Sequence, residues 1–201
     1  AYTSILEVPG EVDLAIIVVN AKFVLSTIDQ CHEKGIKGIC IITAGFKETG
    51  KEGAELEKQL VEKLKEYGMR CVGPNCLGVV NTHPDIRMDG CFAESLPERG
   101  NIGFVSQSGA LGGGILNILK DLNLGFAQFI SIGNQADVNA ETALEYWEND
   151  ADVEQILLYM ESIQNPSNFR RLASRITKKK PILALKAGRS AAGASAASSH
   201  T

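Results

Sequence analysis

The chain has 201 residues, which is enough for one to two domains at about 150 residues per domain. Hydrophobic residues make up 44% and charged residues 22%, a composition typical of a globular protein. The net charge of −4 excludes the basic surface of a nucleic-acid-binding protein, and no stretch reaches the roughly 18 apolar residues that a membrane helix needs. Five cysteines without a C-x-x-C pair predict reduced thiols and a cytoplasmic location, and the histidine spacing gives no metal site.

Short apolar runs alternate with amphipathic helical segments along the chain. This alternation predicts an α/β protein whose parallel sheets are covered by helices on both faces. The clearest helix contains Leu56, Leu60, Leu64 and Tyr67 at helical spacing, followed by Gly68 as a stop. In the first part of the chain we expect strands at 13–19, 37–43 and 69–72 and helices at 21–34 and 52–67.

Residues 81–100 lose this rhythm and are rich in Pro, Gly and Asp, so we expect a linker there. The pattern then resumes, with strands expected at 101–106, 126–132, 153–160 and 182–185, helices at 110–122, 139–148 and 166–178, and a Gly/Ala/Ser loop at 186–201. The sequence therefore predicts two doubly wound parallel-sheet domains, at 1–80 and 101–201. A Rossmann-like domain begins with a strand and a glycine-rich phosphate turn, and none precedes Asp13, so the first domain is either unusually small or partial.

A tight turn formed by Gln107, Ser108 and Gly109 joins the strand at 101–106 to the next helix. Free N–H groups at a helix start, together with the helix dipole, form an anion site. The small side chains of Ser108, Gly109 and Ala110 would let a phosphate approach closely. The turn equally suits a plain strand-to-helix connection with an N-cap serine, so both interpretations remain open here.

Two ionisable residues stand where α/β proteins often place chemistry. Glu161 follows the strand at 153–160, and ligands bind beyond the carboxyl ends of such strands. A carboxylate there can fix the tautomer of a histidine and stabilise its charged form. His200 lies in the small-residue loop, and its imidazole could serve as a nucleophile that carries a phosphoryl group. Taken singly, Glu161 also fits a solvated carboxylate and His200 a histidine in a terminal tail.

Taken together and in order, these features resemble one family. The chain is similar to the alpha part of the nucleoside-diphosphate-forming acyl-CoA synthetases, the superfamily of succinyl-CoA synthetase, and most of all to ADP-forming acetate and acyl-CoA ligases. The motifs that carry the resemblance are DLAIIVVNAKF (13–23), ITAGF (42–46), GPNCLG (73–78), GFVSQSGAL (103–111), SIGN (131–134) and KAGRS (186–190) leading to Ser199-His200-Thr201. The resemblance implies the C-terminal half of a CoA-binding domain over 1–80, followed by a flavodoxin-like succinyl-CoA-ligase domain over 101–201.

The resemblance also implies a role for each matching residue. His200 is expected to carry the phosphoryl group, and Glu161 to hydrogen-bond its imidazole. Ser108, Gly109 and Ala110 are expected to bind the phosphate at the helix start. The residues expected to line the coenzyme A cleft are Asn20, Ala21, Lys22, Thr43, Ala44, Gly45 and Asn75, of which Asn75 is expected to face the meeting point of the two domains.

The implied reaction interconverts acyl-CoA, ADP and phosphate with a carboxylic acid, CoA and ATP, through an acyl phosphate and a phosphohistidine. The expected partners are a small carboxylic acid and an ATP-grasp beta subunit or fused domain that binds ATP or ADP and Mg²⁺. Because the glycine-rich turn is missing and the chain ends one residue after His200, we expect a fragment that is inactive alone.

Two other functions remain alternatives. One is a CoA-binding regulatory module of a fused protein acetyltransferase, in which the phosphohistidine is commonly lost. The other is a flavodoxin-like redox domain with flavin at the 106–109 turn. A flavin needs aromatic shields, and the sequence near that turn offers only Phe104.

Overall fold

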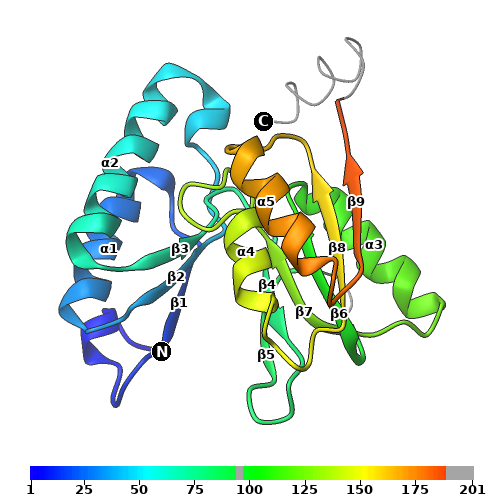
Figure 1. Ribbon diagram of the computed structural model, residues 1–201. Helices are drawn as coiled ribbons and strands as arrows, with labels where there is room; N and C mark the ends of the chain where they lie inside the picture. The colour runs from blue at the N-terminus through cyan, green and yellow to red at the C-terminus, as the bar shows by residue number, and fades with distance from the viewer. Residues whose placement is uncertain (94–96, 189–201) are drawn as a thin grey trace.

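The computed structural model describes residues 1–93 and 97–188 and contains two β-sheets flanked by helices (Figure 1). Every strand and helix predicted above is present, with ends shifted by a few residues. The strands are β1 (Leu14–Ile17), β2 (Gly38–Ile41), β3 (Arg70–Val72), β4 (Gly78–Asn81), β5 (Met88–Cys91), β6 (Arg99–Ser106), β7 (Phe126–Ser131), β8 (Gln155–Met160) and β9 (Ile182–Lys186). The helices are α1 (Val24–Glu33), α2 (Lys51–Tyr67), α3 (Gly109–Asp121), α4 (Ala140–Trp147) and α5 (Pro166–Ile176), with short 3-10 turns η1 (Ile5–Glu7), η2 (Ala21–Phe23) and η3 (Lys47–Thr49).

The first sheet consists of three parallel strands in the order β1-β2-β3. Helices α1 and α2 lie together on one side of it, as Figure 1 shows. A buried cluster that includes Ile28, Ile39 and Leu60 fills the space between helices and strands. Helix α2 ends at Gly68, whose φ of +61° is the left-handed conformation that allows the last carbonyls to be capped.

One glycine in the first turn of α2 is required by close packing. A Cβ atom on Gly53 would lie 1.8 Å from the carbonyl oxygen of Phe46, a distance that no side chain can tolerate. The segment before α2, which includes η3, therefore folds directly back onto the helix. This contact fixes the loop that follows β2.

The second sheet has six strands in the order β5-β4-β7-β6-β8-β9. Strands β7, β6, β8 and β9 are parallel, and their order matches that of a flavodoxin-like sheet. Strands β4 and β5 are antiparallel, so the sheet is mixed and not parallel throughout. The prediction of a linker at 81–100 is wrong, because this segment contains regular strands. It holds β5, which pairs with β4, and the start of β6.

The second sheet is covered on both faces. Helices α4 and α5 lie on one face and α3 lies on the other (Figure 1). Trp147 of α4 and Leu172 of α5 belong to the first of the two cores, and Leu116 of α3 packs with Phe104 and Phe129 in the second. This three-layer arrangement is the one predicted for a doubly wound domain.

The two sheets are joined by backbone hydrogen bonds and by a small buried cluster. The N–H groups of Asn134, Ala136 and Val138, after β7, donate to the carbonyls of Pro74, Gly73 and Cys71 at 2.9, 3.1 and 3.0 Å. Cys40 of β2 packs against Cys76 and Val79 in the same region. The segments 71–75 and 132–138 thus form one continuous junction.

No helix in the described part of the chain is both long enough and apolar enough to cross a lipid bilayer.

Candidate functional site

A cavity of about 530 Å³ opens where the junction between the two sheets meets the carboxyl ends of β6 and β8. The strand order of this sheet reverses between β6 and β8. In open α/β sheets, ligands bind in the crevice at the carboxyl ends of the two strands beside such a point. Its lining combines backbone-rich turns with a few polar side chains. The lining residues are Ile42, Ala44, Asn75, Cys76, Leu77, Phe92, Gln107, Ser108, Gly109, Ala110, Gly133, Asn134 and Glu161.

The start of helix α3 forms one wall of this cavity. Ser108 is its N-cap, and the Ser108 hydroxyl oxygen accepts a hydrogen bond from Leu111 N–H at 3.4 Å. Ser106 Oγ donates to the Ser108 carbonyl at 2.6 Å and fixes the turn. The first N–H groups of a helix have no partner inside the helix. Among the described residues no acceptor bonds the N–H groups of Gly109 and Ala110, so both are available to an anion at the positive end of the helix dipole.

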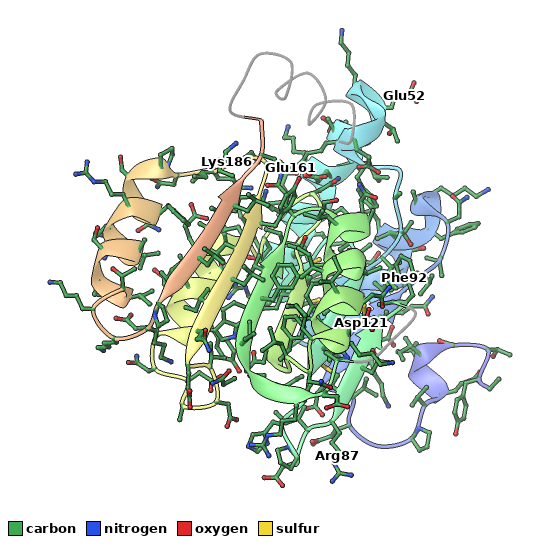
Figure 2. All side chains as sticks on the ribbon, turned by 90° about the vertical axis from the view of Figure 1, so that its right-hand side faces the viewer. Glu52, Arg87, Phe92, Asp121, Glu161 and Lys186 are labelled. Atoms are coloured by element: carbon green, nitrogen blue, oxygen red, sulfur yellow. The ribbon has the colours of Figure 1, made fainter. Side chains whose placement is uncertain are left out.

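Glu161 lies directly after β8 and lines the same cavity as Ser108, Gly109 and Ala110. Figure 2 shows it beside Lys186 at the carboxyl ends of β8 and β9, and Lys186 Nζ donates to the Glu161 carbonyl at 2.8 Å. Glu161 also affects its neighbour Tyr159. Burial raises the pKa of the Tyr159 phenol, and the negative charge of Glu161 and the hydrogen bond to its carboxylate raise this pKa further. The structure therefore brings the expected carboxylate to the expected anion site.

Gln107 is a site residue to which the sequence assigns no role. Its Oε1 accepts hydrogen bonds from the N–H groups of Glu161 and Ser162 at 2.8 and 2.9 Å, and its Nε2 donates to Ser162 Oγ at 3.0 Å. The side chain thus joins the β6–α3 turn to the end of β8. Its burial at the end of a strand is visible only in the folded chain.

Of the seven residues expected to line the coenzyme A cleft, Ala44 and Asn75 line the cavity. The other five lie nearby and have local roles. Thr43 Oγ1 donates to Val19 O at 2.6 Å, Asn20 Oδ1 accepts from Lys22 N–H at 3.2 Å, and a Cβ atom on Gly45 would lie 2.9 Å from that of Ala21. These contacts tie the ends of β1 and β2 together beside the cavity.

Asn134 is a second site residue whose role the sequence does not indicate, although it belongs to the SIGN motif (131–134). Its Nδ2 donates to Glu48 Oε2 and Glu57 Oε2 at 2.6 and 2.8 Å, and its Oδ1 accepts from Asn75 Nδ2 at 3.3 Å. Lys47 Nζ lies 3.0 Å from Glu57 Oε1. A polar network centred on the buried side chains of Glu57 and Asn134 therefore connects α2 and η3 to the wall of the cavity.

The expected phosphoryl carrier, His200, lies outside the described residues. The other histidines do not line the cavity: His32 stacks on Tyr67, and His83 Nε2 lies 3.4 Å from Asp152 Oδ2. Within residues 1–93 and 97–188, no group of three or more His, Cys, Asp or Glu side chains is arranged to hold a metal ion.

Comparison with known protein families assigns both parts of the chain. Residues 99–201, just over half of the chain, match the succinyl-CoA ligase like flavodoxin domain. The chain belongs to the succinyl-CoA ligase family. Residues 1–82 match a CoA binding domain, so this member of the family combines the two domain types that its motifs indicate.

Curated relatives of this succinyl-CoA ligase family member include ADP-forming ligases. The chain is 50% identical over 201 residues to the acetate–CoA ligase [ADP-forming] II subunit alpha of Pyrococcus furiosus, and it covers 43% of that protein. It is 42% identical over 203 residues to the 4-hydroxybutyrate–CoA ligase [ADP-forming] of Nitrosopumilus maritimus, of which it covers 29%. The chain thus spans less than half the length of these relatives.

A solved structure of the family has the same fold. The dinucleotide forming acetyl-coenzyme A synthetase 1 of Ca. Korarchaeum cryptofilum, in its apo form, matches 98% of this chain and 43% of its own with a TM-score of 0.92 and 38% sequence identity. The α/β class and the pairing of a CoA-binding with a flavodoxin-like domain are therefore confirmed.

Proposed function

We propose that this chain is the phosphohistidine and acyl-CoA part of an ADP-forming acyl-CoA ligase. The observation that carries the proposal is the cavity in which the start of α3, the carboxylate of Glu161 and the junction with the CoA-binding domain meet. The identity to ADP-forming acetate and 4-hydroxybutyrate ligases supports this activity. A related synthetase is described in complex with phosphate and ADP, which supports the use of both.

The start of α3 binds the phosphoryl group in this proposal. The N–H groups of Gly109 and Ala110 point from the positive end of a 13-residue helix, and the Ser108 hydroxyl holds the first turn in shape. Fixed donors of this kind stabilise the charge on a transferring phosphoryl group without reorganising during the reaction. Because the donors are backbone groups, small side chains at these positions keep the approach open.

Glu161 orients the nucleophile. His200 attacks the phosphorus of the acyl phosphate with one ring nitrogen, the carboxylic acid leaves, and the phosphohistidine later passes the group to ADP. A carboxylate that accepts a hydrogen bond from the other ring nitrogen fixes the tautomer and stabilises the positive charge that develops on the ring. Gln107 holds Glu161 in place through its backbone N–H.

The acyl-CoA end of the reaction lies on the other wall of the cavity. Ala44 and Asn75 come from the CoA-binding domain and face the start of α3 across it. Coenzyme A, once bound, supplies the thiol that exchanges with phosphate on the acyl group. Nearby, Asn20, Ala21, Lys22, Thr43 and Gly45 form the rim on which the rest of that substrate rests.

The remaining components belong to other parts of the complete protein. ATP or ADP and Mg²⁺ bind an ATP-grasp beta subunit or fused domain, and the second substrate is a small carboxylic acid. The five cysteines are free thiols in the structure, which supports a reducing, cytoplasmic environment.

Phosphate transfer to the protein tests the proposal. The complete protein containing this chain is incubated with its nucleotide-binding part, labelled ATP and Mg²⁺, and acid-labile phosphate on the chain is measured. The label should vanish in His200→Ala and persist in His83→Ala, because His83 lies away from the cavity. Label that survives the loss of His200 overturns the proposal. Coenzyme A binding without any label would instead support the regulatory alternative.

A further inference from the structure

The network around Asn134 joins charged residues of α2 and η3 to a side chain that lines the cavity. Its members are Lys47, Glu48, Glu57, Asn134 and Asn75. Glu57 is 7% exposed and Asn134 is 3% exposed, so the carboxylate and the amide are both shielded from water. Buried groups of this kind must satisfy each other, because an unpaired one costs free energy.

The two carboxylates determine which way the amide of Asn134 points. Burial raises the pKa of Glu48, but hydrogen bonds from Asn134 and from the N–H groups of Gly45 and Phe46 outweigh it, so this pKa lies below its usual value. An ionised carboxylate only accepts hydrogen bonds. The Nδ2 group of Asn134 therefore faces Glu48 and Glu57, and its Oδ1 must face the opposite side.

The amide of Asn134 in turn determines which way the amide of Asn75 points. Because Asn134 presents an oxygen, Asn75 donates to it with Nδ2. The backbone of Asn75 is fixed as well: its N–H donates to Thr43 O at 3.0 Å, and its φ of +57° is a conformation that asparagine tolerates. Asn75 Oδ1 has no hydrogen-bond donor among the described residues, and Asn75 lines the cavity. The amide thus offers an acceptor to a ligand.

We infer that Lys47, Glu48, Glu57 and Asn134 are positioning residues that hold Asn75 with its carbonyl oxygen toward a hydrogen-bond donor of the acyl-CoA substrate, an amide N–H or the thiol. The inference rests on the proposed function. Lys47 offsets the charge of Glu57, since its Nζ contacts that carboxylate and also donates to the main-chain carbonyl of Asn134. Asn75 and Asn134 both line the cavity, but the side-chain oxygen of Asn134 already accepts from Asn75, so in this inference Asn75 bonds the substrate and the other residues position it.

A matched control lies at the same junction. Asp137 Oδ2 accepts from Arg70 Nε and from Cys71 N–H, both at 2.8 Å, so it also ties the loop after β7 to the first sheet. Asp137 is not among the residues that line the site cavity. A network that merely holds the sheets together should respond to Asp137→Asn and to Asn134→Asp in the same way.

The test uses the complete, purified ligase and measures KM for coenzyme A, kcat, thermal unfolding and phosphate transfer from ATP to the histidine. Asn134→Asp replaces the donor with a third carboxylate, and we expect KM for coenzyme A to rise about tenfold or more, as for the loss of an oriented hydrogen bond. Asp137→Asn should lower the unfolding temperature and leave KM unchanged.

Two further variants keep the test decisive. The double variant Asn134→Asp with Glu48→Gln exchanges amide and carboxylate across one hydrogen bond, and we expect it to recover most of the lost affinity for coenzyme A. Glu57→Gln is milder and should raise KM by about threefold, because one oxygen of this residue serves Asn134 and the other serves Lys47. This variant answers the question if Asn134→Asp does not fold.

The outcomes distinguish failure of the proposed function from failure of the inference about Asn75. An unmodified ligase that neither labels its histidine nor forms acyl-CoA overturns the proposed function and this inference with it. An active ligase in which the Asn134 and Glu57 variants match Asp137→Asn in KM overturns the inference alone. Failure of the exchanged pair to recover affinity does so as well.

Discussion

The side-chain oxygen of Gln107 accepts a hydrogen bond from the backbone N–H of Glu161 at 2.8 Å, across two neighbouring parallel strands. This bond links the turn that precedes α3 to the residue that follows β8. The proposed anion site and the carboxylate beside it are therefore linked directly, although 54 residues separate Gln107 from Glu161 in the chain.

The first prediction concerns this link. Gln107→Leu leaves the N–H groups of Glu161 and Ser162 without their acceptor, and we expect a loss of about 1–3 kcal/mol in the free energy of unfolding. Gln107→Glu keeps an acceptor oxygen but adds a negative charge beside the anion site. We expect it to retain more stability than the leucine variant, yet to slow histidine phosphorylation at least as much. Chemical denaturation and the labelling rate check both, and equal labelling by Gln107→Glu and wild type would contradict the assignment.

A second prediction separates capping from phosphate binding at the start of α3. Ser108→Ala should cost about 0.5 kcal/mol, because its cap bond is long at 3.4 Å. Asn139→Ala, at the start of α4, should cost about 1 kcal/mol, because the Asn139 oxygen accepts from Thr142 N–H at 2.9 Å. Ser108→Asp retains a capping oxygen but repels phosphate, so we expect phosphorylation to fall about tenfold or more.

Asn139→Ala is the control for this prediction, because Asn139 does not line the cavity. It should unfold more easily and label at the normal rate. If Ser108→Asp labels as fast as Asn139→Ala, the start of α3 is not the phosphate site.

The third prediction uses Tyr159 as a reporter of Glu161. Burial and the neighbouring carboxylate both raise the pKa of this phenol, burial more strongly. Glu161→Gln removes the charge, so the pKa of Tyr159 should fall toward its ordinary value but stay above it. Absorbance titration of the phenols, with Tyr159→Phe to identify the signal, measures the change. An unchanged titration would show that the two side chains do not interact in solution.

A fourth prediction tests the fold of the loop before α2 with two glycines inside helices. Gly53→Ala places a Cβ atom 1.8 Å from Phe46 O, so the loop or the helix must move, at a cost of about 1–3 kcal/mol. A Cβ atom on Gly114 of α3 meets nothing within 4 Å, so Gly114→Ala should stabilise the protein by about 0.5–1 kcal/mol. Denaturant midpoints give both values, and a neutral Gly53→Ala would mean that the loop packs differently.

The sequence predicts the regular elements well because their signals are local. Helix α2 shows its apolar face through Leu56, Leu60 and Leu64 and ends at Gly68. Strands β4 and β5 are missed because they become strands only by pairing with each other and with β7. Asp89 and Gly90 within β5 are typical of turns, so only the distant partner strands make this segment extended.

The site residues also divide into those with a local sequence signal and those that depend on distant partners. Ser108, Gly109, Ala110 and Glu161 could be placed at one edge because they follow strands that were themselves predictable. Gln107 and Asn134 could not, since their importance comes from partners 54 to 86 residues away. The five rim residues beside the cavity were selected by motif, and a motif does not distinguish a side chain that lines a cavity from one that supports its rim.

We expect the junction between segments 71–75 and 132–138 to make the two domains unfold together. Three backbone hydrogen bonds and a buried cluster cross it, so neither sheet can unravel without exposing groups of the other. We therefore expect one calorimetric transition whose measured enthalpy equals the van't Hoff enthalpy, where independent domains would give two. Hydrogen exchange should then protect the amides of Ala136 and Val138 as strongly as those at the centre of either sheet.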